Sequence, residues 1–217
     1  MNPEPATRLL LAEVLVHSQD LESALVEIEG VLSDNPRNPE ALIARARVLN
    51  RMNLWEAALD AAENAAAQDP GAPSPAIEKV IALRGLGRLH EALAAADDNL
   101  ARHPSCQEAQ NAKLDILLEL EMWVDAIQVA SEILEVEEND ALLFKRAQAY
   151  MESGHAADAL RDLAEIAKPE ALGPAAARLR LRAYRRLQNW PEVITILDPI
   201  QNLIDCLSNR DKLHLPP

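Results

Sequence analysis

Two markers recur along this chain at one spacing, and that spacing limits the folds open to it. An alanine followed by a branched apolar residue returns every 34, 34, 34, 33 and 34 residues, as Ala24, Ala58, Ala92, Ala126 and Ala159, with Val193 in the sixth place. A proline keeps the same 34-residue step at Pro36, Pro70 and Pro104. Because a fixed period of this length marks stacked structural units, the sequence predicts a repeat protein rather than a single globular core.

Each unit has the pattern of two helices joined by a short turn. In the second unit, residues 39–52 predict a first helix that begins at Pro39, since proline is tolerated in a first turn. Residues 56–68 predict a second helix, on which Ala58, Ala62 and Ala65 share one face. Small side chains on that face let neighbouring helices approach closely.

These units resemble the tetratricopeptide repeat. The resemblance rests on alanine at place 20 of a 34-residue unit, small or apolar residues at places 24 and 27, proline at place 32, and leucine or tryptophan at place 17, namely Leu21, Trp55, Leu89, Trp123 and Trp190. It implies an all-α fold, a right-handed α-solenoid of about six helix-turn-helix repeats. We expect these repeats to start near Pro5, Pro39, Pro73, Gln107, Ala141 and Pro174.

The resemblance is incomplete in a few places. Arg8 and Ala12 stand where the family has tryptophan and glycine in the first helix, Glu138 stands where it has proline, and the fifth unit is one residue short. The pentatricopeptide repeat is the nearest rival, but it reads RNA. The 34-residue step and the formal net charge of -14 both oppose it, since nucleic-acid binding needs a positive surface.

The predicted solenoid spans residues 1–207, and residues 208–217 are expected to form a tail or linker. Pro199 breaks the last helix, and residues 200–207 then predict a capping helix. Its apolar stripe consists of Ile200, Leu203, Ile204 and Leu207. This stripe folds back on the sixth unit, serves as a self-association surface, or forms a seam to a further domain.

The chain lacks the sequence patterns of several other functions. It has six glycines and no glycine-rich phosphate loop, and its five histidines show no metal-binding spacing. Cys106 and Cys206 form neither a metal motif nor a disulfide framework, which favours a reducing compartment. We therefore expect a cytoplasmic, non-enzymatic protein with no cofactor, no metal, no nucleic-acid partner and no membrane segment.

The resemblance also implies where a partner would bind. In the family, places 2, 5, 9, 12 and 13 of the first helices face a concave groove. Carried over place by place, the predicted peptide-binding residues are Ile43, Arg47, Asn50, Arg51, Ile77, Ile81, Arg84, Asn111, Lys145, Arg178, Arg182 and Arg185. The family's clamp for a C-terminal carboxylate is incomplete in every frame, so chaperone-tail binding is not predicted.

Residues 175–186 hold five arginines and no acid. Residues 1–140 carry 10 basic and 26 acidic side chains, whereas residues 141–217 carry 11 basic and 9 acidic ones. The arginines either contact a ligand in the groove or form salt bridges with Asp158, Asp162 and Glu165 of the neighbouring helix. Both interpretations are open at this point.

The predicted function is protein–protein interaction, in which the groove binds a peptide or helix of a partner, with an acidic segment as one possibility. Two alternatives remain. The chain is a docking or substrate-recognition domain of a larger enzyme, for example a bacterial transferase, or it is a self-assembling scaffold.

Overall fold

The computed structural model describes residues 4–137, 139–167 and 173–196 of the chain. Across these residues the regular structure is helical and contains no strand. The chain divides into two compact units, Met1–Glu121 (unit 1) and Met122–Pro217 (unit 2). The predicted all-α fold of helix-turn-helix repeats is confirmed, whereas the predicted capping helix and tail lie outside the described residues.

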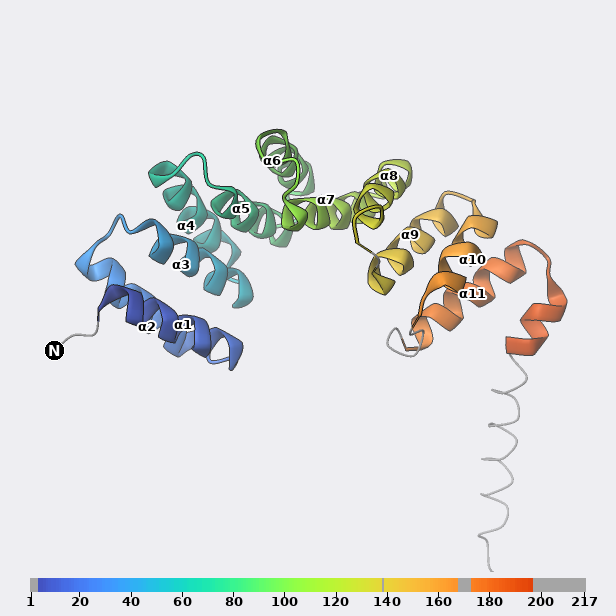
Figure 1. Cartoon of the computed structure of the whole chain (residues 1–217), viewed down its shortest axis with the longest axis horizontal. Coiled ribbons are helices and arrows are strands. Elements are labelled where there is room, and N and C mark those ends of the chain that lie inside the picture. The colour runs from blue at the N-terminus through green and yellow to red at the C-terminus, as the bar shows by residue number, and fades with distance from the viewer. Residues whose placement is uncertain (1–3, 138, 168–172, 197–217) are drawn as a thin grey trace, which may run out of the picture. The chain divides into compact units, whose positions relative to one another are not determined.

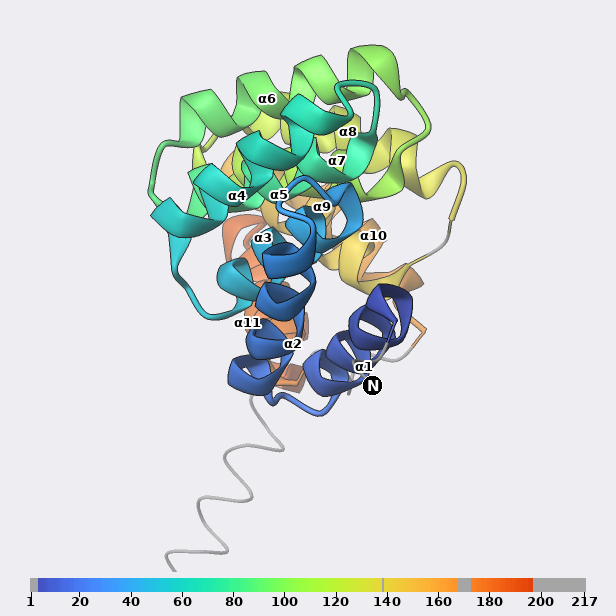
Figure 2. The same ribbon diagram turned by 90° about the vertical axis from the view of Figure 1, so that its left-hand side faces the viewer.

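Unit 1 consists of successive helix pairs in which each second helix packs beside its own first helix (Figures 1 and 2). Its helices are α1 (Pro5–His17), α2 (Leu21–Asp34), α3 (Pro39–Arg51), α4 (Trp55–Gln68), α5 (Pro73–Gly85), α6 (Leu89–Arg102) and α7 (Gln107–Glu119). The first helices α1, α3 and α5 have proline in the first turn, where the missing N–H would have no helical partner anyway.

Unit 2 repeats the same pattern. Its helices are α8 (Trp123–Leu134), α9 (Asp140–Glu152), α10 (Ala156–Glu165) and α11 (Pro174–Arg186), and residues 190–196 are also helical. The N-cap of α9 is Asn139, whose side chain accepts hydrogen bonds from the backbone N–H groups of Ala141 and Leu142.

The alanines that revealed the period lie at the centre of the packing. Ala24, Ala58, Ala92, Ala126 and Ala159 are all completely buried, each on a second helix of its pair. An alanine at this position lets the neighbouring helix backbone approach, so the sequence marker corresponds to a structural requirement.

One close approach in unit 1 depends on a glycine. The indole of Trp55, at the start of α4, lies directly against Gly85, at the end of α5. A Cβ atom on Gly85 would overlap the indole ring. Glycine at this position therefore allows the tryptophan to seat against the following repeat.

The turn after each first helix contains one residue with a left-handed backbone. The values of φ lie between 56° and 95° at Gln19, Asn53, Gly87, Glu121, Gly154 and Gln188. Only two of these six residues are glycines, for which this conformation carries no steric cost. The other four turns hold a mild local strain that the adjacent helices enforce.

In unit 1, cations at one position of the first helices bind acids on the preceding second helix. Arg45 pairs with Glu29 at 2.7 Å, Lys79 with Glu63 at 2.8 Å, and Lys113 with Asp97 at 2.6 Å. Both the cations and the acids are spaced by 34 residues. We call this series the inter-repeat ladder.

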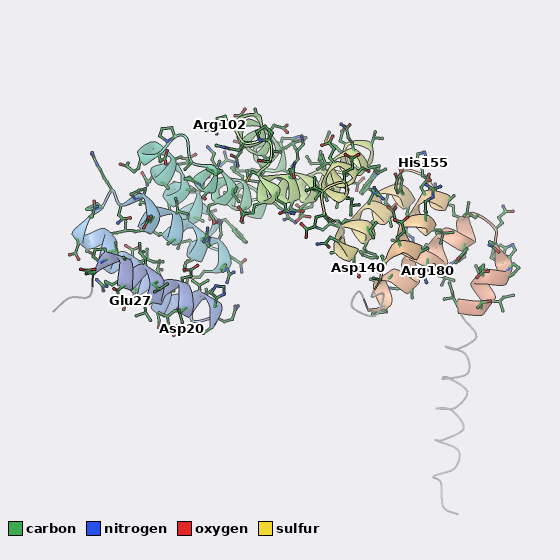
Figure 3. All side chains as sticks on the ribbon, viewed as in Figure 1. Asp20, Glu27, Arg102, Asp140, His155 and Arg180 are labelled. Carbon is green, nitrogen blue, oxygen red and sulfur yellow. The ribbon has the colours of Figure 1, made fainter. Side chains whose placement is uncertain are left out.

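Unit 2 has cations at the same position with different partners. Arg146 Nη1 donates to Ser131 Oγ at 3.0 Å. Arg180, which Figure 3 labels, donates through Nη2 to the carbonyl oxygen of Leu163 at 2.6 Å. Exposed ion pairs contribute about 0–1 kcal/mol each. The inter-repeat ladder therefore adds little to the stability of the stack, and its main effect is to fix the orientation of each repeat on the preceding one.

Within the described ranges, no helix combines the length and apolar character needed to cross a membrane.

Candidate functional site

The first helices of unit 1 enclose two adjacent cavities. The α1–α3 cavity measures about 490 Å³ and is lined mainly by residues of α1 and α3, including Leu9, Leu10, Glu13, Val16, Glu40 and Ala44. The α3–α5–α7 cavity measures about 550 Å³ and is lined by residues of those three helices. Arg47 and Arg51 line both cavities, which we together call the unit 1 groove.

Half of the predicted binding residues come together in the second of these cavities. Arg47, Asn50, Arg51, Ile77, Ile81 and Asn111 all line the α3–α5–α7 cavity, although α3, α5 and α7 are separated in sequence by complete helices. Ile43 takes a different place, because it is half-buried and packs against the core between α1, α2 and α3.

A buried carboxylate that the sequence analysis missed organises this cavity. Glu78 on α5 is 5% exposed, and it accepts hydrogen bonds from Arg47 Nε at 3.0 Å and Asn50 Nδ2 at 2.9 Å. Asn50 Nδ2 also donates to the backbone carbonyl of Glu78 at 3.0 Å. An acid among apolar neighbours was the available signal, since the same position of the preceding and following first helices is Ala44 and Ala112.

The two arginines shared by the cavities are held differently. The Arg47 side chain is 52% exposed above the buried carboxylate of Glu78. Arg51 Nη1 donates to the carbonyl oxygen of Val16 at 3.3 Å, and no acid in the described part of the chain forms an ion pair with it. Arg47 and Arg51 thus lie beside one buried anion, Glu78, at the point where the cavities meet.

Arg84 already forms ion pairs with two acids of the neighbouring first helix, α7. It contacts Asp115 at 3.1 Å and Glu119 at 2.5 Å on α7. Partial burial lowers the pKa of the Arg84 guanidinium, but hydrogen bonds and charge interactions with Glu119 and Asp115 outweigh this and raise it. Its charge is thus neutralised within the protein.

The remaining predicted residues lie in unit 2. Lys145 is half-buried on α9, and Arg182 on α11 pairs with Glu152 at 2.9 Å. Arg178 and Arg185 are exposed on α11 and make no ion pair with any described residue. The arginine-rich helix is therefore only partly neutralised by the chain itself.

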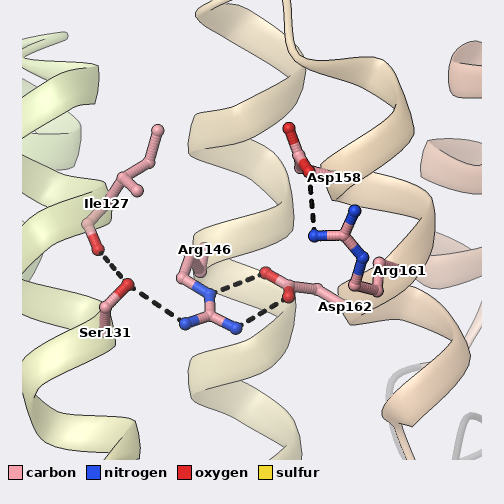
Figure 4. Close-up of polar contacts among 6 residues, drawn as sticks. All are labelled: Ile127, Ser131, Arg146, Asp158, Arg161 and Asp162. Atoms are coloured by element: carbon pink, nitrogen blue, oxygen red, sulfur yellow. Dashed lines mark hydrogen bonds and ion pairs between the residues drawn. The ribbon is translucent and has the colours of Figure 1, made fainter.

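Two of the three acids proposed as salt-bridge partners for these arginines, Asp158 and Asp162, pair with other residues (Figure 4). Asp158 pairs with Arg161 at 3.0 Å, one turn along α10. Asp162 is 3% exposed and accepts from Arg146 Nε at 2.8 Å and Nη2 at 2.7 Å. Arg182 does form a salt bridge, as the second interpretation predicted, but its partner is Glu152 on α9 rather than an acid of α10.

The bidentate pair of Arg146 and Asp162 also ties α8 to α9 and α10. Arg146 Nη1 reaches Ser131 Oγ on α8, and that hydroxyl donates to the carbonyl oxygen of Ile127 at 2.7 Å. The Tyr150 ring centroid lies 5.9 Å from the guanidinium carbon. The Asp162 hydrogen bonds raise the pKa of Arg146 in spite of its partial burial.

In residues 4–137, 139–167 and 173–196, no three His, Cys, Asp or Glu side chains gather closely enough to hold a metal ion.

Solved structures with the same fold include proteins of several kinds. PilW, described as a widely conserved type IV pilus biogenesis factor, matches with a TM-score of 0.80 at 20% identity, covering 93% of this chain and 94% of its own. TTC0263, a thermophilic tetratricopeptide repeat protein of Thermus thermophilus, matches with a TM-score of 0.64 at 22% identity, covering 85% and 100%. YrrB, described as a tetratricopeptide repeat protein with an unusual peptide-binding site, matches with a TM-score of 0.63 at 16% identity, covering 81% and 91%.

No curated protein sequence matches the chain. The family model described as tetratricopeptide repeat matches residues 9–73 and 77–141, which is more than half of the chain. Members of this family are generally non-enzymatic modules for protein–protein interaction. The chain belongs to the tetratricopeptide repeat family.

Proposed function

We propose that this protein is a non-enzymatic interaction module and that the unit 1 groove binds a segment of a partner protein. The observation that carries the proposal is the convergence of Arg47, Asn50, Arg51, Ile77, Ile81 and Asn111 on one cavity. Most residues that line this cavity are polar, and Arg47 and Asn50 among them are held in place by hydrogen bonds, whereas Ile77, Ile81 and Ala112 supply apolar contact. Binding sites combine apolar contact with fixed polar groups in this way.

The fixed polar groups support this role. Arg47 and Asn50 are oriented by the buried carboxylate of Glu78, so their positions are set before any partner arrives. A preorganised site loses less side-chain entropy on binding than a mobile one. YrrB, whose fold is similar, is described as having a peptide-binding site.

Site-specific photo-crosslinking tests the proposal. A photoreactive residue at Ile81, which is exposed in the groove, is compared with the same residue at Val26, which is exposed on α2 outside the groove. In an extract of the source cells, we expect the Ile81 variant to crosslink one partner segment reproducibly and the Val26 variant not to do so. Equal labelling from both positions would show that the groove is not the binding surface.

The arginine face of α11 is a second candidate contact surface, because Arg178 and Arg185 remain unpaired among the described residues. We propose that Lys145, Arg178, Arg182 and Arg185 contribute a basic contact in unit 2. Reversing the charge at Arg178 and Arg185 should weaken partner capture without shifting the unfolding midpoint. Unchanged capture would exclude this surface.

A further inference from the structure

The groove also indicates which kind of segment it recognises, and this inference rests on the function proposed above. We propose that it binds an extended segment with a single internal acidic residue between two apolar residues. The carboxylate would lie at Arg47 and Arg51, and one apolar side chain would enter each cavity.

The charge at the junction of the cavities favours one carboxylate. The Nε of Arg47 is occupied by Glu78. Neither Arg47 Nη1 nor Nη2 donates a hydrogen bond to any described residue. Arg51 uses Nη1 on a neutral carbonyl oxygen. The junction therefore keeps guanidinium donors for an incoming acid, and arginine is well suited to carboxylates.

Each cavity also has apolar side chains in its walls. Leu10, which is 63% exposed, lines the α1–α3 cavity together with Leu9 and Ala44. Ile81, which is 37% exposed, lines the α3–α5–α7 cavity with Ile77. Each cavity is large enough for one leucine or methionine side chain, whose burial would supply most of the binding free energy.

Acidic residues of the groove limit how acidic the bound segment can be. Exposed Glu13 and Glu40 line the α1–α3 cavity, and exposed Glu108 lines the α3–α5–α7 cavity. None of the three forms an ion pair with a described residue. A run of several acids would meet these like charges, so a polyacidic segment is disfavoured.

The spacing of the helices sets the spacing of the ligand residues. Packed helices lie roughly 8–10 Å apart. The α1–α3 cavity lies between two first helices and the α3–α5–α7 cavity spans three, so their centres are about one and a half helix spacings apart, roughly 12–15 Å. An extended chain advances roughly 3.3 Å per residue. The two apolar residues should therefore be about four positions apart, with the acid at one of the three positions between them.

Binding of synthetic peptides to the full chain tests this inference. The probes are fluorescent, C-terminally amidated twelve-residue peptides of serine and glycine with the core Leu-Glu-Ser-Ser-Leu, Leu-Ser-Glu-Ser-Leu or Leu-Ser-Ser-Glu-Leu. Matched probes carry Gln in place of Glu, Ala in place of both Leu residues, or Glu at all three central positions. We expect one of the three single-Glu probes to bind at least about 10-fold more tightly than its Gln and Ala counterparts, and more tightly than the triply acidic probe.

A double-mutant cycle assigns the carboxylate to its partner. In the Arg51→Gln protein, the preference for Glu over Gln should fall below about 2-fold, because the contact is lost. Arg88→Gln is the matched control, since Arg88 is an exposed arginine of unit 1 outside the groove. Circular dichroism of both variants checks that the helices are retained.

Three outcomes would overturn the inference: no probe binds at 1 mM ligand (~4 kcal/mol of binding free energy), Gln and Glu probes bind equally, or the Glu preference survives in the Arg51→Gln protein. None of these affects the proposed function if Ile81 still crosslinks a partner segment. Loss of that crosslink would instead remove the proposed function itself.

Discussion

Removing the buried carboxylate of Asp162 should strongly destabilise the protein. In the Asp162→Ala variant, Arg146 loses two short hydrogen bonds, of 2.8 and 2.7 Å, and its counter-charge. The Arg146 side chain is only 17% exposed, so water cannot fully replace them. Ser131 and Tyr150 remain as its polar and aromatic contacts in the described structure.

The magnitude follows from the burial of both partners. Breaking a buried ion pair by deleting one partner costs roughly 3–5 kcal/mol, because the other charge stays buried. Arg146 retains one hydrogen bond and can move part of its guanidinium toward water, which places the expected loss near 3 kcal/mol. That is a large part of the roughly 5–15 kcal/mol by which most domains are stable.

The assay is urea unfolding followed by circular dichroism, with hydrogen exchange to locate the change. Asp158→Ala is the matched control, since it removes the same atoms from the same helix. Asp158 pairs with an Arg161 side chain that is 70% exposed, so its loss should cost about 1 kcal/mol or less. In Asp162→Ala, amides of α8, α9 and α10 should exchange faster.

Equal free energies of unfolding for the two variants would refute the reasoning. That result would mean that Arg146 finds an equivalent partner or water when Asp162 is absent. A loss above about 2 kcal/mol for Asp162→Ala alone supports it.

Two further substitutions test the backbone and packing arguments. Gly85→Ala should lower the free energy of unfolding by about 1 kcal/mol, because the clash with Trp55 outweighs the better helix propensity of alanine. A gain in stability, measured by urea unfolding, would show that the indole moves freely. Glu121→Gly should raise the free energy of unfolding by up to about 1 kcal/mol, since φ at Glu121 is 58° and glycine adopts this conformation without steric cost. A loss of stability in the same assay would show that the entropy of the unfolded chain dominates at this turn.

The fold could be predicted from the sequence because the repeat period of about 34 residues sets both the buried alanine positions and the turns between helices. Each buried alanine of the series lies where a neighbouring helix approaches, so the same residue type is required every 34 residues. Assigning groove positions by their place in the repeat located six binding candidates in one cavity. Their convergence follows from helix geometry, which fixes which positions share a face.

The partners of the long charged side chains could not be predicted in the same way. Arg182 pairs with Glu152 of the preceding first helix, α9, rather than with an acid of α10. Glu78 was missed because it occupies place 6 of its repeat, which is not one of the places that face the groove in the family. The 34-residue spacing of Lys79 and Lys113 was visible in the sequence, and it indicates the ladder.

The ladder has a consequence for how such a chain can grow. In unit 1 each of these junctions places a cation on the first helix and an acid on the preceding second helix. A duplicated helix pair therefore carries both halves of the junction and meets a matching charge at each end. Gain or loss of a whole repeat therefore leaves this charge pairing intact at the new boundary.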